Sequence, residues 1–198
     1  MSATERREQI LDVAIGVFAE FGLDGARTRQ IADACGINEA LLYKHFPSKD
    51  RLFVESILHL HSRYTNEWWK IMEEASNGLQ AVRKIQRDRI IMMFEHPQFC
   101  NNILHCAAAA TRDEDMLKSI REWTAQGQEY VEEMLRMGIM DGSIRYDLDV
   151  EASVWWMRSF SLYVNMSIVG DLHESMTLER ALEVLDGYLE NISITGKL

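Results

Sequence analysis

The chain has 198 residues, 47% hydrophobic and 26% charged, and this composition excludes a disordered or fibrous protein. It lacks any run of about 18 uncharged apolar residues and begins without the apolar core of a signal peptide, so we expect a cytoplasmic protein with no membrane partner. The net charge is −10, but residues 1–52 hold seven Lys/Arg against eight Asp/Glu, so a nucleic-acid partner for this part is not excluded.

The first element in chain order is an amphipathic helix. Apolar residues recur at helical spacing from Ile10 to Phe21, and Gly22 is placed to end the helix. After a short link, Thr28 is a suitable N-cap for a second, short helix that ends at Gly36.

A third short helix follows, with Asn38 as its expected cap. Pro47 ends it, because the residue before a proline disfavours the α region, and Ser48 can cap a much longer helix. No later segment alternates with a period of two residues. We expect the remaining helices near residues 79–95, 98–110, 114–139, 149–169 and 177–194.

The two short helices fit a helix-turn-helix. Ile31 and Ala32 give the first helix a small apolar inner face, and Gly36 supplies a residue that tolerates left-handed backbone geometry. Leu42 and Phe46 can anchor the second helix inward while its N-terminal half enters a major groove. The predicted fold is all-α: an N-terminal three-helix helix-turn-helix domain joined by a long helix to a C-terminal helical bundle, about nine helices in total.

Residues 28–53, TRQIADACGINEALLYKHFPSKDRLF, closely resemble the DNA-binding region of the TetR family of transcriptional regulators, as does AEFG at 19–22. The resemblance implies a DNA-binding domain at 1–47 and a ligand-sensing and dimerisation domain at 48–198. It also implies a repressor, not an enzyme, that binds a palindromic operator of double-stranded DNA as a homodimer and is released by a small apolar or amphipathic effector molecule.

The resemblance also implies which residues contact DNA. Hydroxyl and basic groups set the register on phosphates, and the candidates for this are Thr28, Tyr43, His45 and Lys49. The candidates for contacts with base edges are Arg29, Glu39, Ala40, Leu41 and Lys44. For two of these residues an alternative to a base contact stays open. Glu39 is also suited to stabilise the helix dipole without contacting DNA, and Leu41 lies beside the core face of the helix.

The last two predicted helices carry apolar stripes that favour a four-helix dimer interface. The interface candidates are Trp155, Trp156, Ser159, Tyr163, Met166, Leu178, Leu182, Leu185 and Leu189. The alternative is that one stripe belongs only to the core of a single subunit.

Methionine and aromatic residues in the middle helices are typical of an adaptable apolar pocket, although such residues at helical spacing more often belong to an ordinary hydrophobic core. The pocket candidates are Trp68, Met72, Met93, Phe94, Phe99, Asn102, His105, Trp123, Met134 and Arg158. The sequence does not indicate which effector binds, and we expect neither a cofactor nor a metal.

Cysteine and histidine gather in residues 96–106, but their spacing is not that of a recognised zinc site. Two alternatives to an effector-released repressor therefore stay open. The first is an effector-independent or activating regulator of the same fold. The second, less favoured, is a metal- or thiol-dependent enzyme that uses this cluster.

Overall fold

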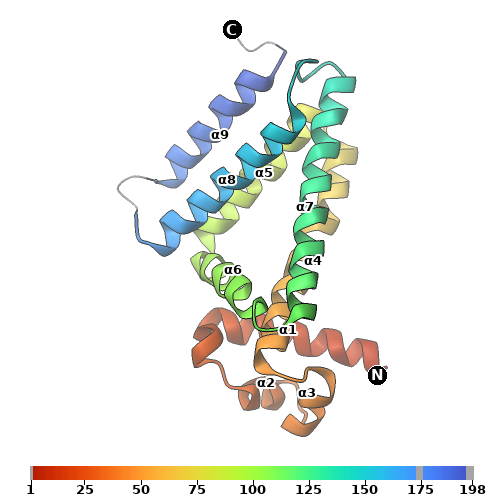
Figure 1. The fold of residues 1–198 in the computed structure, drawn as a ribbon, viewed down its shortest axis with the longest axis vertical. Helices are drawn as coiled ribbons and strands as arrows, with labels where there is room; N and C mark the ends of the chain where they lie inside the picture. The colour runs from red at the N-terminus through yellow and green to blue at the C-terminus, as the bar shows by residue number, and fades with distance from the viewer. Residues whose placement is uncertain (1, 173–175, 195–198) are drawn as a thin grey trace. The chain divides into compact units, whose positions relative to one another are not determined.

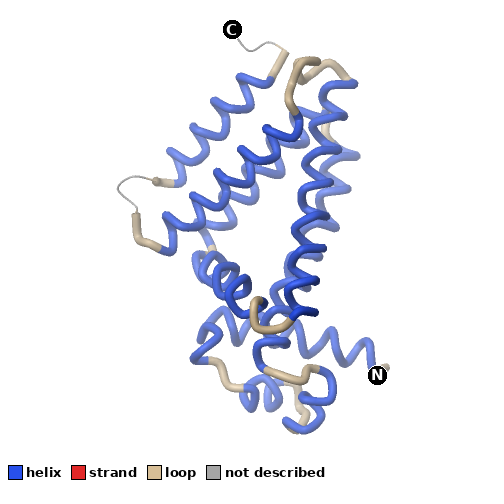
Figure 2. The backbone as a smooth tube through the Cα atoms, viewed as in Figure 1, coloured by secondary structure: helices blue, strands red, loops and turns tan. Residues whose placement is uncertain are grey.

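The computed structural model describes residues 2–172 and 176–194. These residues form nine helices, α1 (Ala3–Gly25), α2 (Thr28–Ala34), α3 (Glu39–His45), α4 (Lys49–Glu74), α5 (Gly78–Glu95), α6 (Pro97–Ala110), α7 (Glu114–Met140), α8 (Val150–Val169) and α9 (Leu178–Ile192) (Figure 1). Loops join the helices, and within the described ranges the only β-type pairing is an isolated bridge between Ile144 and Ser193 (Figure 2). The all-α prediction is confirmed.

Several helix ends lie where the sequence predicts them. Gly22 has a φ of 66°, which interrupts α1 one turn before its last residue. The side chain of Asn38 accepts a hydrogen bond from the backbone N–H of Leu41 at 2.8 Å and caps α3. The hydroxyl of Ser48 accepts one from the backbone N–H of Arg51 at 3.0 Å at the start of α4.

The prediction that Thr28 caps α2 is wrong. Arg27 occupies the cap position, and its backbone N–H donates to Oε1 of Gln30 at 2.9 Å. Thr28 is instead the first residue of α2. Its hydroxyl is therefore available for a contact outside its own helix.

The described structure divides into two compact units. Unit 1 comprises Met1–Tyr64 and Asn101–Trp123, and unit 2 comprises Thr65–Cys100 and Thr124–Leu198. The divisions fall within α4, α6 and α7. By sequence, unit 1 has a net charge of −2 and unit 2 of −8.

The core of unit 1 is built around the helix-turn-helix. Phe18 of α1 and Phe53 of α4 are fully buried and meet edge to face, with ring centroids 4.9 Å apart. The side-chain amide of Asn102 donates to the backbone carbonyl of Phe18 at 3.3 Å. The other large buried side chains here include Ile10, Ile31, Leu42, Phe46 and Leu52.

Unit 2 has a core of its own. A side chain at Gly78 would place its Cβ 2.2 Å from the backbone nitrogen of Gly138, so the start of α5 lies directly against the end of α7. The rings of Trp156 on α8 and Tyr188 on α9 stack with centroids 3.7 Å apart. None of the helices that the structure describes combines the length and the apolar character that a membrane crossing needs.

Candidate nucleic-acid interface

Helices α2 and α3 form the predicted helix-turn-helix. The inner-face residues Ile31 and Ala32 of α2 are buried, and so are Leu42 and Phe46 at the base of α3. Gly36, in the turn between the helices, has a φ of 66°, the left-handed geometry for which glycine was expected. Because α3 is anchored by its inner face, its opposite face is left open to solvent.

Three polar side chains come together where α2 and α3 begin. The hydroxyl of Thr28 donates to Oε1 of Glu39 at 2.8 Å and lies 3.3 Å from the hydroxyl of Tyr43. The Tyr43 side chain is 44% exposed although its ring is large and apolar. This arrangement brings two of the expected phosphate contacts and one of the expected base contacts into a single cluster.

Lys49, the first residue of α4, is tied to the link before α2. Its ammonium group donates to the backbone carbonyls of Ala26 at 3.2 Å and Asp24 at 3.5 Å. A lysine has three N–H donors, so one donor is left for a phosphate oxygen. The two carbonyl contacts could not be predicted from the sequence, because they join positions more than 20 residues apart in the chain.

The remaining DNA-contact candidates lie on or beside the same surface. Arg29 is exposed and forms an exposed ion pair with Asp33 at 3.7 Å, which constrains it little. Ala40 and Lys44 are exposed, whereas Leu41 is half-buried. The remaining candidate, His45, is half-buried next to Phe46 at the end of α3.

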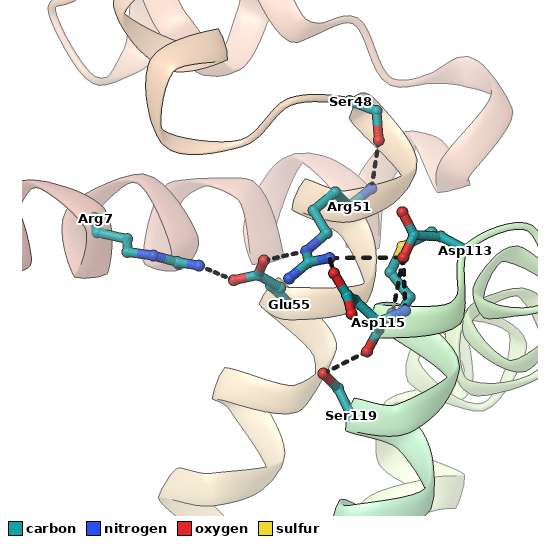
Figure 3. A network of polar contacts seen from close by, with 8 residues as sticks. Arg7, Ser48, Arg51, Glu55, Asp113, Asp115 and Ser119 are labelled. Atoms are coloured by element: carbon teal, nitrogen blue, oxygen red, sulfur yellow. Dashed lines mark hydrogen bonds and ion pairs between the residues drawn. The ribbon is translucent and has the colours of Figure 1, made fainter.

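An ionic network fixes the start of α4, and Figure 3 shows its members. The guanidinium of Arg51 donates to Glu55 at 2.7 Å and lies 3.7 Å from Asp113 and 3.9 Å from Asp115. Glu55 also pairs with Arg7 of α1. The hydrogen bond to Glu55 is the main reason that the pKa of Arg51 is raised. The network joins α1, α4 and the start of α7 within unit 1.

Helix α8 exposes an apolar face in unit 2. Trp155 is 61% exposed and Leu162 55%, and Tyr163, Met166 and Ser159 are exposed as well. Trp155, Ser159, Leu162 and Met166 follow one another at intervals of three or four residues, which places them on one side of the helix, and Tyr163 is adjacent to Leu162.

Other interface candidates have partners in their own subunit. Leu185 and Leu189 of α9 are 1% and 0% exposed, so their assignment to a dimer surface is corrected: they belong to the core of unit 2. Leu178 and Leu182 are half-buried against that core. Trp156 stacks on Phe160 and Tyr188. The stripe of α9 is thus largely intramolecular, which is the alternative that the sequence left open.

The pocket candidates fall into both units. In unit 2, Met72, Met93 and Met134 are buried in one core cluster, with Trp68 and Phe94 packed against it. The half-buried Phe99 and Arg158 belong to unit 2 as well. Asn102, His105 and Trp123 belong to unit 1, where the amide of Asn102 holds the Phe18 carbonyl and Trp123 contacts the ring of His61. The methionines are thus core residues in this structure.

The cysteines of α6 are poorly suited to catalysis. Burial raises the pKa of Cys100 to about 11 and that of Cys106 to about 12, so both thiols are protonated at neutral pH. Among the described residues, no group of three or more His, Cys, Asp or Glu side chains is placed to hold a metal ion.

The fold and the exposed face of α3 define a helix-turn-helix DNA-binding protein, and comparisons with known proteins identify its family. Residues 10–55 match the model described as "Bacterial regulatory proteins, tetR family". The chain is 31% identical over 160 residues to the HTH-type transcriptional repressor KstR2 of Rhodococcus jostii (strain RHA1), which covers 77% of this chain and 74% of that protein. The chain belongs to the TetR family and is a DNA-binding transcriptional regulator, not an enzyme.

Solved structures share the fold. The crystal structure of a TetR transcription regulator from Haloarcula marismortui ATCC 43049 matches with a TM-score of 0.80 at 17% identity and covers 96% of this chain and 99% of that one. The transcriptional regulator FadR from Bacillus subtilis, in complex with stearoyl-CoA, matches with a TM-score of 0.69 at 16% identity and covers 94% and 97% of the two chains.

Proposed function

We propose that this protein is a repressor that binds a palindromic operator in cytoplasmic double-stranded DNA as a homodimer and is released by a small-molecule effector. The observation that carries the proposal is the open face of α3, where Thr28, Glu39 and Tyr43 meet beside an anchored helix. The relative from Rhodococcus jostii is named a transcriptional repressor, which supports repression and not activation.

The proposal assigns DNA binding to residues 1–47 and sensing and dimerisation to 48–198. Thr28, Tyr43, His45 and Lys49 set the position on the phosphates, because hydroxyls and ammonium groups donate to phosphate oxygens. The base contacts come from Arg29, Ala40, Leu41 and Lys44, with Glu39 contributing the carboxylate oxygen that Thr28 does not occupy.

Dimerisation uses the exposed face of α8. One helix-turn-helix reads one half-site, so specific binding requires a second copy about 34 Å away along the DNA. Trp155, Leu162, Tyr163 and Met166 supply large apolar side chains whose burial against a second copy stabilises a dimer. Trp156, Leu178 and Leu182 are half-buried, so part of each side chain is accessible to a second copy.

Release follows from a shift in population. An effector lowers the occupancy of the operator if it binds more tightly to a conformation of the dimer that cannot reach both half-sites. The FadR of the same fold, in complex with stearoyl-CoA, supports a small-molecule ligand for this one. Unit 2, with its methionine-rich core, is the proposed site of the effector.

Fluorescence anisotropy on a duplex selected from a random pool tests the proposal. The variant Tyr43→Phe/Lys49→Gln loses a phenolic hydroxyl and an ammonium group, and we expect a loss of affinity of about 10- to 100-fold with a shallower salt dependence. The matched control is Lys118→Gln, because Lys118 is an exposed lysine elsewhere in unit 1. Equal affinities for the double variant and the control would overturn the proposed DNA interface.

A further inference from the structure

Two arginines of unit 2 lie near each other, and neither has a carboxylate partner among the residues that the structure describes. Arg89 is on α5 and Arg158 on α8, and these helices pack against each other (Figure 1). Both side chains are half-buried. Nη1 of Arg158 donates to the backbone carbonyl of Thr124 on α7 at 3.1 Å, whereas Arg89 has no hydrogen bond or ion pair to any residue that the structure describes.

This lack of partners contrasts with the rest of the unit. By sequence, unit 2 holds 18 acidic residues against ten Lys and Arg, so carboxylates are abundant. The five other arginines of the unit each have a carboxylate within 4 Å: Arg83 and Arg87 share Asp186, and Arg136, Arg145 and Arg180 pair with Glu132, Asp147 and Glu183. Arg89 and Arg158 have no such carboxylate in the part of the chain that the structure describes.

The pair is electrostatically unfavourable as it stands. Burial lowers the pKa of Arg89 to about 10, and the nearby charge of Arg158 lowers it as well. Burial also lowers the pKa of Arg158. Both side chains remain charged at neutral pH, so two like charges are held together where water solvates them incompletely. A bound anion removes this cost.

Further unsatisfied polar atoms lie on the same two helices. Gln86, one turn before Arg89, and Asn165, two turns after Arg158, are each 2% exposed. Nε2 of Gln86 and Oδ1 of Asn165 have no hydrogen-bond partner within the described parts of the chain. Buried polar atoms are rarely left unpaired, so this part of the core has unused capacity for hydrogen bonds.

The surroundings suit a ligand with an apolar part. A Cβ at Gly127 of α7 would lie 4.0 Å from Nη1 of Arg158 and would meet no other atom of the described residues within that distance, so these residues leave space beside this guanidinium. Ile85 and Met93, one turn on either side of Arg89, are buried in the core cluster, as is Met157 beside Arg158.

We propose that Arg89 and Arg158 form the anion-binding end of the effector site and hold the carboxylate or phosphate ester of an amphipathic small molecule. Guanidinium groups match both anions in geometry and are always charged at neutral pH. The apolar part of the ligand packs on the aliphatic and methionine side chains nearby. This inference rests on the proposed function, because it gives the chemical class of the effector.

A surface groove of unit 2, with a volume of 380 Å³, is a weaker candidate for an anion. Its lining includes Arg83, Lys84 and Arg87. Asp186 pairs with both arginines, and Asp88 pairs with the lysine at 2.5 Å. An anion in this groove would have to compete with carboxylates that are already bound.

Thermal unfolding with defined probes tests the proposal. The probes are inorganic phosphate, decanoate and coenzyme A, with decanol as the uncharged counterpart of decanoate and sodium chloride as the control for ionic strength. We expect the anions, but not decanol or chloride, to raise the Tm of the wild type by about 2–4 °C near saturation. A larger shift with coenzyme A identifies a phosphate ester, and a larger shift with decanoate identifies a carboxylate.

Two variants separate a binding site from a structural role. Arg89→Gln should keep or raise the Tm without ligand, because it removes a like-charge contact, and should lose the response to the anions. Lys84→Gln, on the same helix but with an exposed, paired lysine, should respond as the wild type does. No anion response in the wild type, an equal response to decanol, or an unchanged response in Arg89→Gln would each overturn the proposal.

Operator affinity, measured on the same samples, distinguishes this inference from the proposed function. Wild type and Arg89→Gln should bind the operator equally without anion, and the effective anion should release only the wild type. Absence of operator binding in the wild type would refute the repressor, whereas the Tm response would still report on the anion site. Operator binding with no anion effect on either Tm or affinity would refute the anion site alone.

Discussion

The hydroxyl of Thr28 donates to the carboxylate of Glu39 at 2.8 Å and so joins the first residue of α2 to the first residue of α3. The two residues are 11 positions apart, and each was expected to contact DNA independently. Their bond sets the relative position of the two helix N-termini and leaves Tyr43 beside them. We therefore propose that the cluster acts as one element of the DNA interface.

Replacing Thr28 with valine tests this bond. Thr28→Val keeps the shape of the side chain but removes the hydroxyl that satisfies Glu39, and we expect operator affinity to fall about 5- to 10-fold, which corresponds to about 1 kcal/mol. Anisotropy titration at fixed salt measures the effect. Thr111→Val, which removes a hydroxyl bonded to the carbonyl of Ala108 in unit 1, is the control and should change affinity by less than about 2-fold. Equal affinities for the two variants would rule out a shared cluster.

Arg51 is expected to stabilise unit 1. Arg51→Met removes the arginine from Asp113 and Asp115 and leaves Glu55 with Arg7 alone, so urea unfolding should show a loss of about 1–2 kcal/mol in the free energy of unfolding, a range that allows for screening by solvent. Arg121→Met removes an exposed pair with Glu114 and should cost less than about 0.5 kcal/mol. A loss for Arg51→Met no greater than that of the control would show that the network of Figure 3 contributes nothing to folding.

The exposed face of α8 should control the oligomeric state. Leu162→Glu places a charge in the centre of the apolar face, so light scattering after size exclusion should show a monomer, and operator affinity should fall by at least about 100-fold. Met140→Glu, at a more exposed apolar residue outside α8, should remain dimeric. A dimer in the Leu162→Glu variant would place the interface elsewhere.

Asp141 should make unit 2 sensitive to acid. Burial opposes the shift, but hydrogen bonds from Ser143 and from the backbone N–H of Gly78 lower the pKa of this carboxyl below its usual value. A lowered pKa in the folded state stabilises the fold above the ordinary carboxyl pKa, and this stability is lost as the pH falls through the folded value.

Asp141→Asn should therefore be less stable than the wild type at neutral pH. This difference in stability should become smaller as the pH is lowered. Urea midpoints measured from pH 7 down to pH 3 give both curves. A constant gap over that range would contradict the assigned role of Asp141. Asp147→Asn, at an exposed aspartate of the same loop, is the control and should follow the wild type more closely.

Local sequence signals predicted most of the fold. Asn38 and Ser48 cap their helices and Gly22 adopts a positive φ, because each of these features depends on chemistry within a few residues. The helix-turn-helix was predictable for the same reason, since Leu42 and Phe46 must be buried for α3 to pack against α2. Thr28 was misplaced by one position because Gln30 satisfies the backbone N–H of Arg27.

Features that depend on distant contacts were not predictable. The apolar stripe of α9 indicates a buried face, but periodicity does not distinguish a core from a dimer interface, and Leu185 and Leu189 proved to be core. Arg158 was selected only as one polar candidate among several, and Arg89 was missed. Their proximity results from the packing of α5 on α8, for which the sequence carries no signal.

The most direct test of the central claim, that α3 reads DNA in a symmetric dimer, is the selection of bound duplexes from a random pool by the wild-type protein. We expect an inverted repeat whose half-sites are centred about one helical turn, or a multiple of it, apart. The same selection with Tyr43→Phe/Lys49→Gln should enrich little or nothing. Failure of the wild type to enrich any sequence, or enrichment of a single unrepeated site, would contradict the account.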